Sequence, residues 1–231
     1  PLTGNYANNR QIKVNIFIRQ KKSFEFKTKT NEIGGDICLA HSIRLRGRDY
    51  TLFLNGDAMG KSMQGAGGAL VLGAVFQSII ERTRIVSNVD AETWLKNTFL
   101  ELQKVFESFD CSMLVLIYIT VLENETGKLY YLNAEHPWGV LYRDSKAIFL
   151  QNRSYYRKLG TPGLQDEISI DHIQLREGDL IILGSDGRDD IALPSPESNV
   201  RVINEDESLF LKHVETADGR LKEMVELISA Q

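Results

Sequence analysis

The spacing of apolar residues changes twice along this 231-residue chain, and these changes limit the folds open to it. Apolar and polar residues alternate at residues 12–16, and the runs 37–45 and 50–54 flank a turn, as expected of strands in a hairpin. Helical spacing follows at residues 66–82 and 94–106. Short strand-like runs then return at residues 113–122, 128–132, 140–143, 147–150, 168–173 and 180–183.

This order predicts an α+β protein, in which hairpins build antiparallel sheets and helices pack outside them, rather than a βαβ protein. Asp90 is a residue type that caps helices and precedes the second helical run, and residues 221–228 carry the apolar stripe of a last helix. Connections are short, so we expect one domain over residues 1–231, with residues 193–199 as a surface loop. The chain begins with Pro1, and we expect a module truncated at both ends.

Composition argues against several classes of protein. The net charge is −4 and no basic run stands out, so a nucleic-acid partner is not expected. Cys38 and Cys111 form no CxxC or Cys/His spacing, which argues against a zinc site or a disulfide framework. Residues 113–122 are too short to span a bilayer, and no signal peptide is visible. We expect a cytoplasmic module without membrane contact of its own, a candidate output domain of a larger membrane-bound sensor.

Three aspartates stand in glycine-containing turns directly after apolar runs: Asp36, Asp57 and Asp186. A carboxylate at a strand end is held rigidly and stays partly exposed, and hard cations such as Mg²⁺ and Mn²⁺ prefer oxygen ligands. Turns use Asp and Gly for backbone reasons alone, which would explain any one of these sites. Three sites of one type, two of them separated by a single hairpin, favour a shared acidic site.

Residues 56–62 look like a phosphate-binding P-loop, because they read GDAMGKS between a strand and a helix. A P-loop has four residues between its two glycines, so that successive amides can surround the phosphates. Here Gly56 and Gly60 are separated by three residues, and the preceding elements are a hairpin. We therefore reject the nucleotide-binding interpretation. Lys61 could still offer a positive charge to a phosphate, and a solvated helix-start lysine explains it equally well.

Six short motifs follow one another between residues 33 and 190. In this order they resemble the SpoIIE-type branch of the bacterial metal-dependent serine/threonine phosphatases, the PPM family with the protein phosphatase 2C-like fold. The resemblance implies a four-layer αββα sandwich, with two central antiparallel sheets flanked by helices, and two Mn²⁺ or Mg²⁺ ions. The motifs are Ile33-Gly34-Gly35-Asp36, Asn55-Gly56-Asp57-Ala58-Met59-Gly60, Asn133-Ala134-Glu135-His136-Pro137, Leu159-Gly160-Thr161-Pro162, Arg176-Glu177-Gly178-Asp179-Leu180 and Ser185-Asp186-Gly187.

The resemblance also assigns roles to residues. Asp57 matches the family's bridging carboxylate, and the backbone carbonyl of Ala58 would be a further metal ligand. Asp36 matches the acidic residue of the Gly-Gly-Asp turn, and Asp186 matches the aspartate of an Asp-Gly turn near the end of the second sheet. The three aspartates are thus the predicted catalytic residues, and the reaction is hydrolysis of phosphoserine or phosphothreonine by water held at two cations.

The family's last metal ligand has no match in this chain. It is an aspartate of an Asp-Asp pair on a strand after the final helix, and no such pair precedes Gln231. Asp189 and Asp190 are too close to Asp186 in sequence, and we expect them to be solvated or to start a helix. The resemblance implies a phosphorylated anti-sigma-factor antagonist of the STAS type as substrate, and a homodimer is left open. The alternative is a phosphatase-like domain without catalysis, used as a regulated binding module.

Two further features allow two interpretations each. His136 could act as a general acid, but we favour a structural histidine that orders its turn. The glycines after Gly60 weaken a helix and permit either close packing or a helix shift that moves the Asp57 turn. On the second interpretation, replacing Gly67 and Gly68 with Ala should change activation with little loss of folding stability.

Overall fold

The computed structural model divides the chain into two compact units, which we describe one at a time. The first unit comprises Pro1–His136 and Asn152–Leu175, and the second comprises Pro137–Gln151 and Arg176–Gln231. Lys61, residues 195–199 of the expected loop and Gln231 lie outside the described residues. The single-domain expectation stays a prediction. The structure describes residues 3–9, 11–20, 22–60, 63–85, 88–154, 156–163, 168–194 and 201–230.

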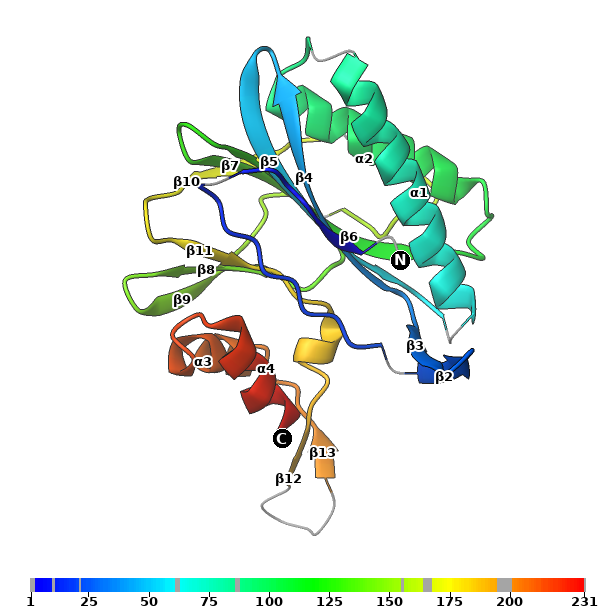
Figure 1. Ribbon diagram of the computed structural model, residues 1–231, viewed down its shortest axis with the longest axis vertical. Helices are drawn as coiled ribbons and strands as arrows, with labels where there is room; N and C mark the ends of the chain where they lie inside the picture. Colours follow the sequence, from blue (N-terminus) through cyan, green and yellow to red (C-terminus); the bar gives the residue numbers. More distant parts are fainter. Residues whose placement is uncertain are drawn as a thin grey trace. The chain divides into compact units, whose positions relative to one another are not determined.

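A six-stranded sheet with the order β1-β4-β5-β6-β7-β10 forms the centre of the first unit (Figure 1). Neighbouring strands are antiparallel except β1 and β4, which run parallel. The predicted hairpins are confirmed, and a separate hairpin joins β2 to β3. The strands are β1 (Gly4–Tyr6), β2 (Lys22–Phe26), β3 (Lys29–Ile33), β4 (Asp36–Leu45), β5 (Arg48–Ala58), β6 (Val115–Glu123), β7 (Lys128–Ala134) and β10 (Asp171–Gln174).

The strand predicted at residues 12–16 is wrong. These residues do alternate between half-buried and exposed positions, but within the described part of the chain they pair with no neighbouring strand and form no ladder. An apolar alternation reports which side of an extended chain is covered, and it does not require hydrogen bonding to another strand. The strand predicted at residues 168–173 is shorter and later than expected, because only β10 pairs with β7.

Helices α1 (Met63–Ile85) and α2 (Ala91–Glu107) cover one face of this sheet (Figure 1). Leu72, Phe76 and Ile80 of α1 are fully buried in the core beneath them. The predicted cap of α2 is confirmed, because the Asp90 carboxylate accepts a hydrogen bond of 2.8 Å from the backbone N–H of Thr93.

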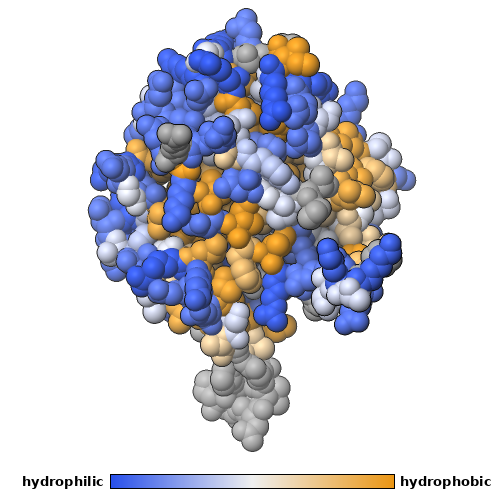
Figure 2. Space-filling view, in the orientation of Figure 1, coloured by the Kyte–Doolittle hydropathy of each residue, from blue (hydrophilic) through white to orange (hydrophobic). Residues whose placement is uncertain are grey.

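By length and apolar composition alone, α1 could cross a membrane. Its fully buried apolar side chains instead face the sheet, as in the core helix of a folded domain. Met63, Leu70 and Ile85 are the large apolar side chains of α1 that remain exposed. The face drawn in Figure 2 likewise shows apolar residues between hydrophilic ones. Folded proteins expose much apolar surface, so these residues do not by themselves mark a binding site.

The second unit contains a three-stranded antiparallel sheet with the order β11-β8-β9. Helix α3, which the sequence analysis missed, packs on β8 and β9, and α4 confirms the predicted last helix. Val140, Phe210 and Val214 belong to the apolar core of this unit. The elements are β8 (Gly139–Arg143), β9 (Lys146–Leu150), β11 (Leu180–Ile182), a 3₁₀ turn (Asp186–Arg188), β12 (Ala192–Pro194), β13 (Arg201–Ile203), α3 (Ser208–Thr216) and α4 (Leu221–Ser229).

Each unit thus pairs a sheet of mainly antiparallel strands with two helices, which confirms the α+β class. The two strands that flank the turn at residues 176–179 belong to different sheets, since β10 pairs with β7 and β11 pairs with β8. This turn is therefore a connection between the units and not the tip of a hairpin.

The glycines at the start of α1 are not equivalent, which gives a stability prediction. A Cβ on Gly68 would stand 2.6 Å from the Cβ of Ala58, whereas a Cβ on Gly67 would meet only Met113 Cε, at 3.7 Å. We expect Gly67→Ala to stabilise the protein by about 0.4–1 kcal/mol through reduced freedom of the unfolded chain. Gly68→Ala should destabilise it by about 1–3 kcal/mol through overpacking.

Urea unfolding of the two variants beside wild type measures this difference. The expectation that both glycines could be replaced with little loss of stability is thus corrected for Gly68. Equal midpoints for the two variants would contradict the described packing of α1 on Ala58.

Candidate metal centre

The β4–β5 hairpin places Asp36 and Asp57 directly opposite each other, and we call these two residues the acid pair. The backbone N–H of Ala58 donates a 3.0 Å hydrogen bond to the carbonyl of Gly35, so the next pair along the ladder is a non-hydrogen-bonded one. In such pairs the Cα atoms stand only about 4.5 Å apart and the side chains are close. The hairpin therefore brings two carboxylates together on the sheet face opposite α1 and α2.

Two like charges at directly opposite positions destabilise a sheet. The other end of the same hairpin has the usual arrangement, because Arg44 faces Asp49 and their side chains form an ion pair at 3.7 Å. Within the acid pair, Asp36 Oδ1 is buried and accepts no hydrogen bond among the described residues. An uncompensated buried carboxylate oxygen beside a second carboxylate is a donor set that fits a hard divalent cation.

Small residues crowd the backbone beside the acid pair. A Cβ on Gly35 would lie 2.2 Å from the carbonyl oxygen of Ala58, and a Cβ on Gly65 would lie 3.1 Å from it. Gly35 and Gly65 thus allow the first turn of α1 to approach the Ala58 carbonyl, which the sequence predicts as a metal ligand. Gln20, which the sequence analysis did not single out, donates a 2.9 Å hydrogen bond from Nε2 to the carbonyl oxygen of Asp36.

Asp186 belongs to the second unit and begins the 3₁₀ turn. Its side chain is exposed, and its carbonyl accepts hydrogen bonds from the N–H groups of Asp189 and Asp190, at 2.8 and 2.9 Å. Asp190 is exposed as expected, but Asp189 is not simply solvated, because Arg188 Nε donates to its carboxylate at 2.9 Å.

Arg188 is the buried anchor of this turn, and no sequence signal indicated it. Its Nη1 donates a 2.7 Å hydrogen bond to the carbonyl of Trp138, and its guanidinium lies 4.4 Å from the centre of the Phe210 ring. Through these contacts the turn that contains Asp186 is attached to Trp138, just before β8, and to Phe210 of α3. All of these residues belong to the second unit.

Among the described residues, no group of three or more His, Cys, Asp and Glu side chains is arranged to hold a metal ion. The structure brings together Asp36 and Asp57, with the Ala58 carbonyl next in sequence. Asp186 as a ligand stays a prediction.

The surroundings of Cys38 and His136 bear on whether either group could act chemically. Burial, together with the negative charge of Asp36, raises the pKa of the Cys38 thiol to about 12, so this thiol is neutral near pH 7. The backbone N–H of His136 donates to Asn133 Oδ1, and Asn133 Nδ2 donates to the His136 carbonyl, both at 2.8 Å. These hydrogen bonds order the turn and favour the structural interpretation of His136.

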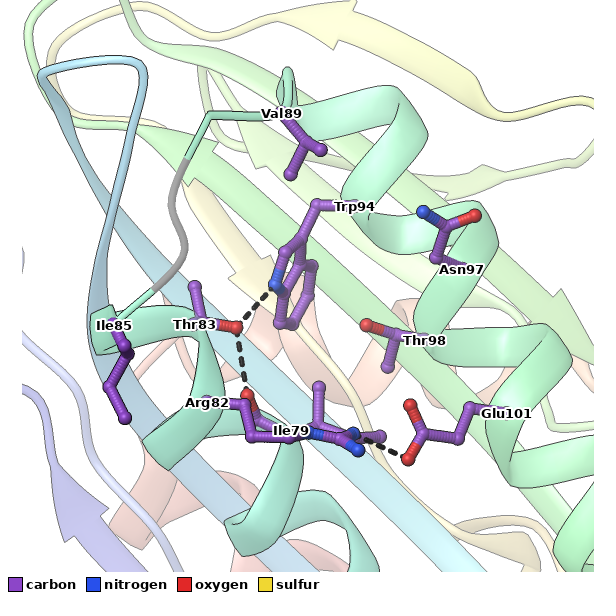
Figure 3. Close-up of a pocket in the computed structure, with 9 residues that line it drawn as sticks. All are labelled: Ile79, Arg82, Thr83, Ile85, Val89, Trp94, Asn97, Thr98 and Glu101. Atoms are coloured by element: carbon purple, nitrogen blue, oxygen red, sulfur yellow. Dashed lines mark hydrogen bonds and ion pairs between the residues drawn. The ribbon is translucent and has the colours of Figure 1, made fainter.

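A groove of about 500 Å³ lies between α1 and α2 (Figure 3). These helices cover the sheet face opposite the acid pair. The lining of the groove includes Trp94, whose Nε1 donates a 2.8 Å hydrogen bond to Thr83 Oγ1, and Arg82, which pairs with Glu101. The lining holds one carboxylate, that of Glu101, and no Cys or His, so it does not provide a metal site.

A family model matches most of the chain. The family model described as Stage II sporulation protein E (SpoIIE) matches residues 47–231, so the chain belongs to the SpoIIE family. A search of curated proteins finds no match.

Solved structures show that the fold is that of PP2C-type phosphatases. The RsbU and RsbW domains of Rv1364c from Mycobacterium tuberculosis match with a TM-score of 0.60 and 18% identity, over 84% of this chain and 50% of that one. The phosphatase domain and regulatory fragment of SpoIIE from Bacillus subtilis match with a TM-score of 0.60 and 15% identity, over 86% and 52%. RsbX in complex with magnesium matches with a TM-score of 0.53 and 11% identity, over 90% and 84%. The chain thus spans about half the length of the first two structures.

Replacing Asp36 of the acid pair should have opposite effects on the stability of the protein with and without metal. Asp36→Asn removes one of two facing charges, so we expect the metal-free protein to gain about 0.2–1 kcal/mol. The same change should abolish stabilisation by Mn²⁺, which for wild type would reach about 2.7 kcal/mol at 100 times the dissociation constant.

Urea unfolding in chelator and in Mn²⁺ measures both effects. Asp49→Asn is the matched control, because it removes an attractive pair from the same hairpin and should leave the response to Mn²⁺ unchanged. Equal stabilisation of wild type and Asp36→Asn by Mn²⁺ would show that the acid pair does not bind the ion.

Proposed function

We propose that this chain is a metal-dependent phosphatase that hydrolyses phosphoserine or phosphothreonine on a bacterial signalling protein. The observation that carries the proposal is the acid pair, which stands on adjacent strands in a chain of the SpoIIE family. Two Mn²⁺ or Mg²⁺ ions would supply positive charge for the phosphate oxygens and lower the pKa of an attacking water. Asp36, Asp57, the Ala58 carbonyl and Asp186 would hold these ions.

The residues of this chain support direct attack by water rather than a phosphoenzyme. Cys38 is the nearest conventional nucleophile in sequence to Asp36, and its raised thiol pKa keeps it unreactive. Asp36 and Asp57 lie on one rigid hairpin, so their carboxylates are positioned before substrate arrives and need little reorganisation. In the reaction, the bond between phosphorus and the serine oxygen breaks, and water supplies the new oxygen on phosphorus.

For the substrate we propose a phosphorylated anti-sigma-factor antagonist of the STAS type. Family membership and the likeness to the RsbU domain of Rv1364c support this proposal. We further propose a cytoplasmic location, as output domain of a larger, membrane-bound sensor, and leave a homodimer open.

The activity test uses the native protein and a phosphoserine peptide. We expect hydrolysis that requires Mn²⁺ and stops with chelator, and we expect Asp57→Asn to lower kcat at least about 100-fold. Asp186→Asn should also lower it if this aspartate is a ligand, and Asp49→Asn should not. Undiminished turnover by Asp57→Asn would show that another site does the chemistry.

The main alternative is a regulated binding module without catalysis. The described residues favour it in one respect, since they hold no ready cluster of three metal-ligating side chains. Wild-type protein that binds a phosphorylated partner but turns over no phosphosubstrate in Mn²⁺ would establish this alternative.

A further inference from the structure

The residues around Leu159 lie beside β6. They continue the row of neighbouring positions that begins with Asp36 on β4 and Asp57 on β5. Leu159 pairs with Val115 of β6 through two hydrogen bonds, from Leu159 N–H to the Val115 carbonyl at 2.8 Å and back at 3.2 Å. Both side chains are fully buried in the core beneath α1 and α2. Neighbouring residues of extended chains point to opposite faces, so Lys158 lies on the face of the acid pair.

The register gives the position of Lys158 along this row. Asp57 pairs with Leu116 of β6, and Leu116 is the residue next to Val115. Lys158 stands beside Leu116 on the far side from Asp57. Strands are about 4.8 Å apart, which puts the backbone of Lys158 about 10 Å from that of Asp57. The half-buried Leu116 occupies the position between them on this face, so a phosphate held by both the acid pair and Lys158 would lie above the Leu116 side chain.

Glu135 holds Lys158 on this face. The Glu135 carboxylate forms an ion pair with Lys158 Nζ at 2.9 Å and a longer one with Arg157 Nε at 3.7 Å. Only 17% of the Glu135 side chain and 23% of the Lys158 side chain are exposed, against 69% for Arg157. The ammonium of Lys158 is therefore partly desolvated and fixed in place.

The backbone of Glu135 is strained. Its φ is +53°, in the left-handed region that costs a side-chain-bearing residue roughly 1–2 kcal/mol. Ala134, just before it, is fully buried in the core, so the left-handed turn follows directly on the last residue of β7. Such strain persists where the surroundings fix it, and it concentrates at functional sites.

We propose that Lys158 binds the phosphate of the substrate and that Glu135 is its positioning residue. This inference rests on the proposed function. A phosphate dianion approaching two carboxylates needs positive charge from the protein as well as from cations, and Lys158 is the partly buried cation of this row. Arg157, which is mostly exposed, would add long-range attraction for a phosphorylated partner.

Two variants separate this role from a merely structural tie between the segment and β7. Lys158→Met removes the charge and keeps much of the side-chain volume. Glu135→Gly removes the positioning carboxylate and relieves the left-handed strain, which offsets part of the stability lost with the ion pair. Lys146→Met is the matched control, because Lys146 also pairs with a glutamate, Glu215, at 3.7 Å.

We expect Lys158→Met to raise KM for the phosphoserine peptide about tenfold, the effect of one hydrogen bond to a charged group. Glu135→Gly should also raise KM. Inorganic phosphate, added in Mn²⁺, should raise the melting temperature of wild type and of Lys146→Met, and this shift should shrink in both site variants.

The outcomes distinguish this inference from the proposed function. If wild type hydrolyses the peptide and both site variants keep its KM and its thermal shift with phosphate, Lys158 does not bind phosphate and only this inference falls. If wild type neither hydrolyses the peptide nor responds to phosphate, both proposals fall. A Glu135→Gly variant that loses stability but keeps wild-type KM would show that the Glu135–Lys158 pair is only a structural tie.

Discussion

The register of the β4–β5 hairpin is the constraint on which the candidate site depends. A shift of one residue would turn every side chain of one strand to the other face and would separate Asp36 from Asp57. The apolar residues of both strands fix this register, because Leu39 and Leu54 pair across the hairpin and are buried in the core. The core that stabilises the first unit thus also holds two carboxylates close together, although their charges repel each other.

Glycine residues allow α1 to pack closely on this hairpin. A Cβ on Gly56 would stand 2.5 Å from Leu72 Cδ2, and one on Gly68 would stand 2.6 Å from the Cβ of Ala58. The absent side chains let α1 pack directly on the strand that carries Asp57. A movement of the first turns of α1 would therefore press on Ala58, whereas Gly67 has room to change without this effect. Close packing explains most of these glycines, and a helix shift would act through the same contacts.

Sequence patterns predicted those features of the structure that depend on residues close together in the chain. The β4–β5 hairpin and the Asp90 cap follow from alternation, turn residues and capping preferences. The register that sets Asp36 opposite Asp57 comes from the structure. The sequence did not predict α3, whose short apolar stripe is buried only once β8 and β9 are in place. Nor did it predict Lys158 or Glu135, because the bridge between Leu159 and Val115 joins residues 44 positions apart and has no local signature. Arg188 was missed for a similar reason, since its partners are Trp138, just before β8, and Phe210 of α3.

Two features of the described site cost free energy of folding. Facing carboxylates cost about 0.2–1 kcal/mol, and a left-handed glutamate costs roughly 1–2 kcal/mol. Domains are stable by only about 5–15 kcal/mol, so both features are appreciable. They occur on one face and at one end of one sheet, and Asn or Gly at the same positions would remove them. A site that must hold cations with carboxylates and then accept a phosphate dianion needs concentrated negative charge and, a short distance away, a fixed positive one. Departures from local preference are expected at functional sites, and here both belong to the charges that such a reaction requires.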